Sequence, residues 1–369
     1  MQTIGILTYQ DALNYGAAFQ CKALYQYVKD SEQNCRVEVI RYINEQINNK
    51  TSFKAIITSK KLTFRRKIAM IVNSFFSITQ RKKFQKFYAD VSFSKEYIPN
   101  NICDVTRECD FYIIGSDQLW NFELNGGDIN YLLPFADKNR VITYSTSIGK
   151  ENIPDDYKEI FIENVSNMSF VSVREDKARQ YINRLIPEKE IALTMDPVFL
   201  MDRNWWLELS GNNTEREGVG LYFFHKKFLS DAHRIIDESG LSDRKIHKIC
   251  GGLSIKDFLN SSVKTGLLYG PNEVLLAINN CILMFTDSFH CVAICIILHI
   301  DFYVFLTGDA GRDSRITQLL EITGLTDRIA SSEKYSIEEI EWEEVDKKIR
   351  EMQSYSRNYL ETALNSVLC

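Results

Sequence analysis

An acid, a hydroxyl and an imidazole lie close together in MFTDSFHCVAICIILHIDFYVF, residues 284–305. Asp287, Ser288 and His290 separate two apolar runs, which are expected to be buried as a strand and as a helix over Val292–His299. A turn of this kind places the free N–H groups of a helix start beside a side chain that can exchange a proton near neutral pH. The pattern therefore predicts an anion-binding turn in which His290 gives or takes a proton.

The first strand-to-helix turn of the chain carries polar residues at the same kind of position. It reads TYQDALNYGAAFQ, residues 8–20, and contains Asn14, Tyr15 and Gly16 just before a helix that is expected to start near Ala17. Asn14 could orient a sugar or a carboxylate, and Gly16 permits a tight turn. The alternative for Asn14 is that it only caps the helix.

A second turn, YIIGSDQLWN, follows a buried strand at residues 112–121. Ser116 and Asp117 stand where that strand ends. A carboxylate at this position could accept substrate hydroxyls or act as a base, and both residue types are also common helix caps.

Two arginines follow predicted strands at turns of the same type. Arg174 lies in FVSVREDKA, where its guanidinium could clamp a carboxylate or phosphate through two parallel hydrogen bonds, or could pair with Glu175. Ser314 and Arg315 lie just before a helix in GDAGRDSRITQLL and offer a second anion site or a cap.

The elements that must position these residues alternate between strands and helices, which is typical of parallel α/β sheets. The order predicts two Rossmann-like units that meet near Asp196-Pro197. We expect an N-terminal domain over 1–195, a C-terminal domain over 196–335, and C-terminal helices over 336–369 that pack back on the first domain. The expected strands are Thr3–Thr8, Val37–Tyr42, Phe111–Ile114, Val141–Ser145, Phe170–Val173, Leu193–Met195, Val219–Phe224, Lys245–Cys250, Ile282–Thr286 and Phe302–Leu306.

Length and composition narrow the class of protein. The chain has 369 residues, 45% of them hydrophobic, and a net charge of -5, which gives no overall reason to expect nucleic acid as a partner. No window of 18 residues is uncharged and apolar, and the N-terminus lacks the basic start of a signal peptide. The nine cysteines have no metal-like spacing. We expect a protein of the cytoplasm.

One segment, residues 54–86, departs from the acidic average. It contains ten Lys or Arg, no Asp or Glu, and interleaved apolar residues, which predicts one or two basic amphipathic helices inserted in the first domain. Two interpretations remain open. The segment is either a solvated face, or a patch that rests on an anionic membrane surface or a diphosphate-linked substrate.

Taken in order, these pieces resemble the polysaccharide pyruvyl transferase family over roughly Ile4 to Ala330. The pieces that carry the resemblance are NYGAAFQ, VEVIRY, IIGSDQLWN, YSTSIG, SVREDKA, MDPVFL, TDSFH and DSRITQLLEITGLTDR. The resemblance implies a glycosyltransferase-B-like fold, in which two Rossmann-like domains face a cleft. It also implies phosphoenolpyruvate as the donor and a saccharide as the acceptor. The implied product is a cyclic pyruvate ketal on two sugar hydroxyls, with release of phosphate, and no metal or organic cofactor is implied.

With this reaction in view, His290 beside Ser288 is the candidate acid that protonates the donor carbon. Asp117 or Asp287 is the candidate base, and Arg174 and Arg315 are candidates for holding the anions of the donor. The family usually has Gly after the His of its SFH motif, whereas this chain has Cys291, and a side chain there is expected to add bulk close to the donor.

Two other functions compete with this reading. A sugar-nucleotide-dependent glycosyltransferase of the same fold would need a base or ribose contact in the second domain, for which Glu273 is the available residue. A saccharide-binding homologue without activity is favoured by Cys291 and opposed by the retention of Arg174, Ser288 and His290 together.

Overall fold

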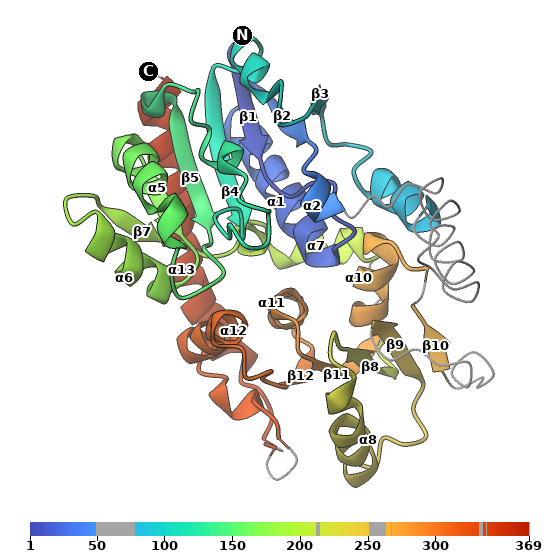
Figure 1. The fold of residues 1–369 in the computed structure, drawn as a ribbon. Coiled ribbons are helices and arrows are strands. Elements are labelled where there is room, and N and C mark those ends of the chain that lie inside the picture. The colour runs from blue at the N-terminus through green and yellow to red at the C-terminus, as the bar shows by residue number, and fades with distance from the viewer. Residues whose placement is uncertain are drawn as a thin grey trace, which may run out of the picture.

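The computed structural model describes residues 1–48, 78–211, 215–250, 263–266, 268–331, 335–336 and 338–368. It consists of two α/β lobes, each built on one parallel sheet (Figure 1). The fold is therefore the predicted pair of Rossmann-like units. Within the described residues, no helix is both long enough and apolar enough to cross a membrane.

The N-terminal lobe holds a seven-stranded sheet in the order β3-β2-β1-β4-β5-β6-β7. Helices cover its faces, so that all five residues of β1 and all six of β5 are buried. Its strands are β1 (Thr3–Leu7), β2 (Arg36–Tyr42), β3 (Phe93–Tyr97), β4 (Phe111–Asp117), β5 (Val141–Thr146), β6 (Val171–Val173) and β7 (Ile191–Leu193). Its α-helices are α1 (Tyr15–Ser31), α2 (Glu45–Asn48), a helix over 78–87, α5 (Asp155–Asn167) and α6 (Asp176–Leu185).

The C-terminal lobe holds a five-stranded sheet in the order β10-β9-β8-β11-β12. The short η4 (Pro197–Leu200) and α7 (Arg203–Leu209) lead into it from the first lobe. Its strands are β8 (Gly218–Tyr222), β9 (Ile246–Cys250), β10 (Val263–Thr265), β11 (Cys281–Thr286) and β12 (Asp301–Val304). Its helices are α8 (Leu229–Glu238), α10 (Pro271–Asn279), α11 (Phe289–Leu298) and α12 (Ala310–Thr323).

The last helix, α13 (Trp342–Leu368), runs from the C-terminal lobe back to the N-terminal one (Figure 1). The hydroxyl of Tyr359 donates to the Thr143 carbonyl of β5 at 3.0 Å. The hydroxyl of Tyr27 in α1 donates to Glu361 Oε1 at 2.6 Å, so α13 lies beside α1. These contacts fasten the end of the chain to the first sheet and hold the two lobes in one arrangement.

Several element boundaries differ from the sequence-based expectation. The strand expected at Leu193–Met195 is Ile191–Leu193, and β3 and β10 were not predicted. The helix after β11 begins at Phe289 rather than Val292, which places His290 in its first turn instead of in a loop. The first turn of α11 is apolar apart from His290, so the hydrophobic pattern of the sequence did not show where the preceding loop ends and the helix begins.

The basic segment is described only in its last part. Residues 54–77 lie outside the described residues, while 78–87 form a helix that packs at the edge of the N-terminal lobe. In this helix Lys83 Nζ lies 2.6 Å from Glu273 Oε1, and Arg81 Nη1 lies 3.8 Å from Asp11 Oδ1. Two of its charges are thus paired within the protein.

Trp206 in α7 is the buried contact that fixes the start of the C-terminal lobe. Its side chain is fully buried, its Nε1 donates to the Val198 carbonyl at 3.0 Å, and its ring packs edge-on against Phe19 of α1 at 5.8 Å. The neighbouring Trp205 is only half-buried. Packing around Trp206 therefore joins α1, η4 and α7.

We expect Trp206→Ala to lower the free energy of unfolding by about 3–5 kcal/mol, because it leaves a large cavity and an unpaired carbonyl. Urea unfolding followed by circular dichroism measures this. Trp205→Ala is the matched control and should cost clearly less. An equal loss of unfolding free energy in the two variants would show that the contact of Trp206 with α1 does not stabilise the fold more than the packing of Trp205 does.

Candidate active site in the cleft between the lobes

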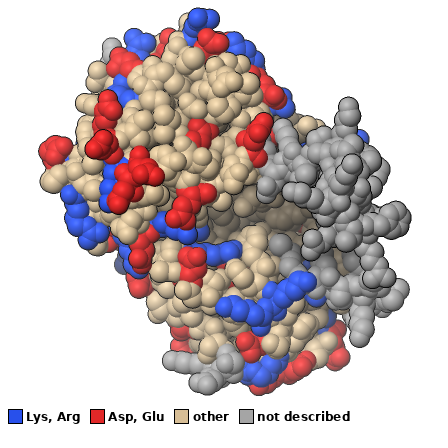
Figure 2. Space-filling model, in the orientation of Figure 1, with Lys and Arg blue, Asp and Glu red and all other residues tan. Residues whose placement is uncertain are grey.

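A cleft of about 760 Å³ separates the two lobes, and both sheets present the carboxyl ends of their strands to it. Figure 2 shows the hollow, with Lys and Arg side chains on the wall formed by the C-terminal lobe. In parallel α/β sheets, ligands bind at this edge. The residues that line the cleft and are used below are Leu13, Asn14, Arg81, Asp117, Gln118, Asn121, Leu124, Lys150, Phe224, Ser288, Phe289, His290, Asp309, Arg312 and Arg315.

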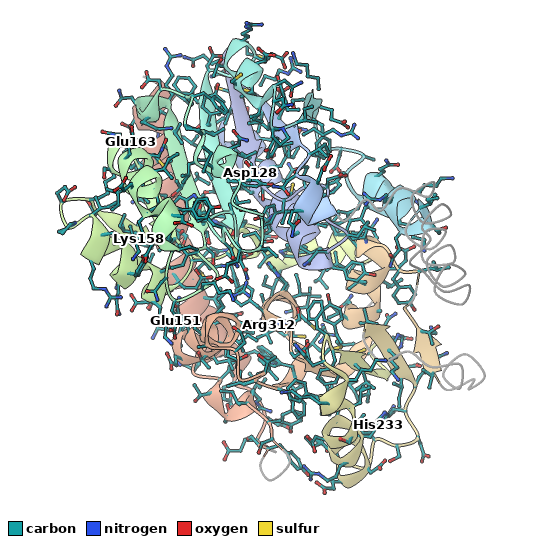
Figure 3. The ribbon with its side chains drawn as sticks, viewed as in Figure 1. Asp128, Glu151, Lys158, Glu163, His233 and Arg312 are labelled. Carbon is teal, nitrogen blue, oxygen red and sulfur yellow. The ribbon has the colours of Figure 1, made fainter. Side chains whose placement is uncertain are left out.

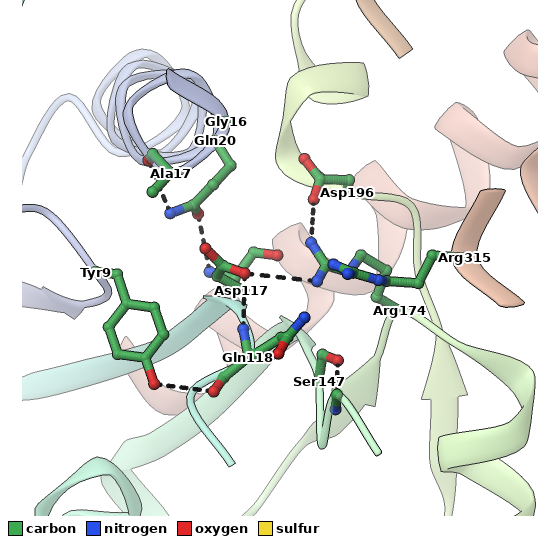
Figure 4. Close-up of polar contacts among 12 residues, drawn as sticks. Tyr9, Gly16, Ala17, Gln20, Asp117, Gln118, Ser147, Arg174, Asp196 and Arg315 are labelled. Atoms are coloured by element: carbon green, nitrogen blue, oxygen red, sulfur yellow. Dashed lines mark hydrogen bonds and ion pairs between the residues drawn. The ribbon is translucent and has the colours of Figure 1, made fainter. Parts of the chain in front are cut away.

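Asp196 is the buried centre of the charge network below the cleft. Its Oδ2 accepts from Arg174 Nη1 at 2.6 Å and lies 3.4 Å from His290 Nε2 (the Arg174 contact is drawn in Figure 4). Burial raises the pKa of Asp196, but the charges and hydrogen bonds of His290 and Arg174 outweigh it and hold the pKa well below its usual range. The carboxylate is therefore ionised, and it lies next to both the guanidinium of Arg174 and the imidazole of His290.

Arg174 is surrounded by carboxylates instead of facing the cleft. Its Nε donates to Glu175 Oε1 at 3.2 Å, and its Nη2 lies 3.7 Å from Asp117 Oδ1. Burial lowers the pKa of Arg174, and the negative charges of Glu175, Asp196 and Asp117 raise it above the ordinary value. In the free protein, Arg174 therefore pairs with Glu175, which is the second of the two alternatives expected from the sequence. Its guanidinium orients Asp196 and Asp117 and does not face a ligand site.

Arg315 lies in α12 at the inner end of the cleft and is held differently. Its side chain is only 9% exposed, its Nε has no hydrogen-bond partner within the described part of the chain, and Glu175 Oε1 is 3.9 Å away. Burial and the nearby charge of Arg174 lower the pKa of Arg315 to about 10. A buried guanidinium with an unpaired donor is costly unless an anion binds there. Arg315, which lines the cleft, is therefore the candidate residue for binding an anion there.

His290 is held between the two lobes. An added Cβ on Gly16 of α1 would lie 2.1 Å from His290 Nδ1, so the imidazole packs directly on the Gly16 backbone. On its other side the ring faces Asp196, and its side chain is 13% exposed toward the cleft. Gly16 thus makes room for His290, a role that differs from the tight turn expected from the sequence.

Ser288 and Asp287 have opposite orientations. Ser288 precedes α11, its hydroxyl does not cap the helix, and it lines the cleft. Asp287 is fully buried, and its carboxylate accepts hydrogen bonds from the backbone N–H groups of Phe224 and His225. Its Oδ2 also lies 2.7 Å from His225 Nδ1. Its carboxylate is occupied by the loop after β8, so the structure contradicts its use as a base in the cleft.

Two of the predicted residues on the first turn of the chain are structural. The Asn14 side chain accepts from the N–H groups of Gly16 and Ala17 and caps α1, although Asn14 also borders the cleft. The Tyr15 hydroxyl donates to the Tyr269 carbonyl at 2.9 Å and joins the lobes. Tyr15 therefore bridges the lobes in this structure, and a contact of Tyr15 with substrate stays a prediction.

Two predicted serines also face away from the cleft. The hydroxyl of Ser116 is buried and donates to the Ser145 carbonyl at 2.8 Å, and that of Ser314 donates to the Gly311 carbonyl at 3.2 Å. Asp117, by contrast, lines the cleft, with its side chain 15% exposed. Among the predicted residues of these turns, only Asp117 offers an oxygen to a ligand.

Cys291 and Glu273 do not have the positions that the sequence suggested. Cys291 is 1% exposed and belongs to the hydrophobic core, so its side chain does not add bulk in the cleft. Glu273 accepts from the Gly270 N–H and pairs with Lys83, which leaves it no role as a ribose contact. Among the described residues there is no group of three or more His, Cys, Asp or Glu that could hold a metal ion.

Sequence reasoning missed two residues of the site. Asp196 was treated only as a domain boundary, although its place after β7 in MDPVFL is the same kind of strand end as the others. Arg312 lies one helical turn before Arg315 and lines the cleft. An arginine at that spacing on the first turn of a helix was the available signal.

Comparisons with known proteins agree with this architecture. Residues 14–309 match the sequence model of a family described as Polysaccharide pyruvyl transferase. Among solved structures, a protein of Listeria monocytogenes assigned as a UDP-N-acetylglucosamine 2-epimerase is 11% identical, with a TM-score of 0.50 over 98% of this chain and 90% of that one. The UDP-GlcNAc 2-epimerase of Methanocaldococcus jannaschii is 12% identical, with a TM-score of 0.45 over 96% and 100%. No curated protein matches the chain.

We expect Gly16→Ala to displace the His290 ring while leaving the fold intact, since the new methyl group would overlap Nδ1. The chain has five histidines, so their ring resonances can be followed individually by NMR. Ser239→Ala, at an exposed position just after α8, is the control. Unchanged His290 resonances in Gly16→Ala would contradict the close packing.

We expect Asp196→Asn to lower the free energy of unfolding by about 3–5 kcal/mol at neutral pH, because it leaves Arg174 without its closest buried partner. The pKa of Asp196 is depressed in the folded protein, so its contribution is present above the unfolded pKa of about 4 and is lost as the pH falls further. The difference between wild type and variant should therefore shrink below about pH 4 in urea unfolding. Asp243→Asn, on the surface, should show no such trend.

Proposed function

Since the chain belongs to the polysaccharide pyruvyl transferase family, we propose that it transfers pyruvate from phosphoenolpyruvate to a saccharide, in the synthesis of cell-surface polysaccharide. The observation that carries the proposal is that the buried, incompletely paired guanidinium of Arg315 and the imidazole of His290 line the same cleft. It combines an anion site with a proton donor, and the donor carries two anionic groups next to the carbon that must be protonated.

The anions of phosphoenolpyruvate would bind on the C-terminal wall of the cleft. Arg315 supplies a charged donor, and Ser288 adds a hydroxyl at the start of α11, where backbone N–H groups are unpaired. Phe289 lies beneath both arginines, with the Arg174 and Arg315 guanidinium carbons 5.4 and 6.0 Å from its ring centre. This shields the site from water, which strengthens its attraction for an anion.

His290 would act as the acid. Its protonated imidazole, compensated by the Asp196 carboxylate, gives a proton to the methylene carbon of the donor, which becomes a methyl group and leaves C2 electrophilic. One acceptor hydroxyl attacks C2. The second hydroxyl then attacks the same carbon, the C2–O bond to phosphate breaks, and phosphate leaves with the second proton. The product is a cyclic ketal. The proton of the first hydroxyl goes to the base, and exchange with water removes it from the base and returns a proton to His290 for the next turnover.

Asp117 would be the base that takes the proton of the attacking hydroxyl. It lines the cleft, and it is oriented by Arg174 Nη2 at 3.7 Å and by the Gln118 N–H at 2.9 Å. Of the two aspartates considered from the sequence, Asp287 is occupied by the His225 loop. The geometry therefore favours Asp117 for this role.

The acceptor would be met in the cytoplasm, free or at the inner face of the membrane. The basic segment 54–86, most of which lies outside the described residues, remains the proposed contact with anionic lipid. Lys83 and Arg81 are already near carboxylates within the protein, so such a contact would depend on the remaining charges of the segment.

The test is phosphate release from phosphoenolpyruvate with a panel of lipid-linked and nucleotide-linked saccharides. We expect His290→Gln to lower kcat by about 10²–10⁴-fold, the usual contribution of a general acid, without loss of folded structure.

The matched control is His233→Gln, which should keep the wild-type kcat. His233 is an exposed residue of α8, far from the cleft (Figure 3). Wild-type turnover by His290→Gln would remove His290 from the mechanism. If a sugar nucleotide alone is consumed and phosphoenolpyruvate is not, the protein is instead a glycosyltransferase.

A further inference from the structure

The outer part of the cleft has an apolar character that the donor does not explain. Leu13, Leu124 and Phe224 are 37%, 45% and 42% exposed, and all three line the cleft. Leu13 and Leu124 belong to the N-terminal wall and Phe224 to the C-terminal wall. Phosphoenolpyruvate has a three-carbon skeleton and would leave most of the 760 Å³ free. This space is where a larger, partly apolar molecule would fit.

Arg312 lies on the face of Phe224, with its guanidinium carbon 4.6 Å from the ring centre. Figure 3 shows Arg312 at the start of α12, on the side of the C-terminal lobe that faces the N-terminal one. In the part of the chain that the structure describes, no carboxylate forms an ion pair with Arg312. The nearby Asp309 carboxylate instead caps α12 through the Arg312 N–H at 3.0 Å.

The other cations of the cleft differ from Arg312 in this respect. Arg81 lies 3.8 Å from Asp11, and Lys150 lies 3.2 Å from Glu123. Arg315 is buried deeper, at the site assigned to the donor. Arg312 is thus an accessible cation that is positioned by an aromatic ring and has kept its hydrogen-bonding edge free.

Phe224 is itself held in a fixed position. Its backbone N–H donates to Asp287 Oδ1 at 2.8 Å, and Asp287 also accepts from the His225 N–H at 3.0 Å. A buried carboxylate therefore fastens the loop after β8 on which Phe224 stands. The Phe224 ring therefore fixes where the Arg312 guanidinium stands, and the part of the ring that remains exposed offers an apolar surface to a sugar.

We propose that Phe224 and Arg312 form the acceptor subsite, and that the acceptor is a saccharide that carries an oxyanion, either a phosphate ester or a carboxylate. A guanidinium that stands over an aromatic ring without a carboxylate partner has N–H groups available for such a group, and it can bind an oxyanion through two parallel hydrogen bonds. The assignment of the ligand as the acceptor rests on the proposed function. The preference of this surface for an anionic saccharide does not depend on the proposed function.

The test is calorimetry with glucose 1-phosphate, glucuronate and glucose, with and without saturating phospholactate. Phospholactate is an unreactive analogue that keeps both anions of phosphoenolpyruvate and occupies the donor site. We expect wild type to bind each anionic sugar at least tenfold more tightly than glucose in both conditions. Comparison of glucose 1-phosphate with glucuronate shows which oxyanion is preferred, and inorganic phosphate alone tests whether the sugar contributes.

Arg312→Gln should remove the preference for the anionic sugars, and Phe224→Ala should weaken all three sugars about equally. Arg350→Gln, an exposed arginine of α13 with its side chain 67% exposed, is the matched control and should bind as wild type. Equal binding of all three sugars to wild type, or a preference that persists in Arg312→Gln, would overturn the subsite.

These measurements need no turnover, so they separate the subsite from the reaction. If phosphate release is absent but the anionic preference is lost in Arg312→Gln, the proposed function fails and the subsite stands. If phosphate release occurs and Arg312→Gln leaves the KM of anionic acceptors unchanged, the subsite fails and the function stands.

Discussion

The ionised carboxylate of Asp196 is the constraint on which the site depends. It is fully buried, and a buried charge is stable only when it is paired and hydrogen-bonded. Arg174 from the N-terminal lobe and His290 from the C-terminal lobe both approach it, so the same carboxylate fixes a guanidinium and an imidazole from different sheets. Arg174 also faces Glu175 and Asp117. Its position therefore sets the orientation of the Asp117 carboxylate, which lines the cleft.

The two lobes supply different parts of the site, and close packing brings them together. The C-terminal lobe contributes Ser288, His290 and Arg315, whereas the N-terminal lobe contributes Asp117 and the Gly16 backbone on which the imidazole rests. The contacts of α13 with β5 and α1 hold this arrangement, because they tie the end of the chain to the first sheet. Any motion that opened the cleft would therefore change the surroundings of His290 directly.

The cleft also divides into two regions of different physical character. Its inner end holds the guanidinium group of Arg315, which is only 9% exposed and therefore suits a small anion with little water. Its outer part carries exposed apolar side chains and Arg312, which suits a larger ligand with both apolar faces and charge. The family is shown by the match over residues 14–309. The donor that we propose would occupy the inner region, and the saccharide acceptor the outer one.

The sequence by itself determined the two α/β units, most strands, and the placement of Asp117 and Ser288 where strands end. His290 and Arg315 lie inside α11 and α12, which begin at Phe289 and Ala310, earlier than the sequence indicated. Apolar runs and their breaks are local signals, and the carboxyl edge of a parallel sheet follows from the order of the elements. Only the tertiary structure decided which turn residues point into the cleft. Asp287 turns to the loop after β8 and Arg174 to Asp196, because the partners that satisfy these buried charges come from distant parts of the chain, and no local pattern specifies them.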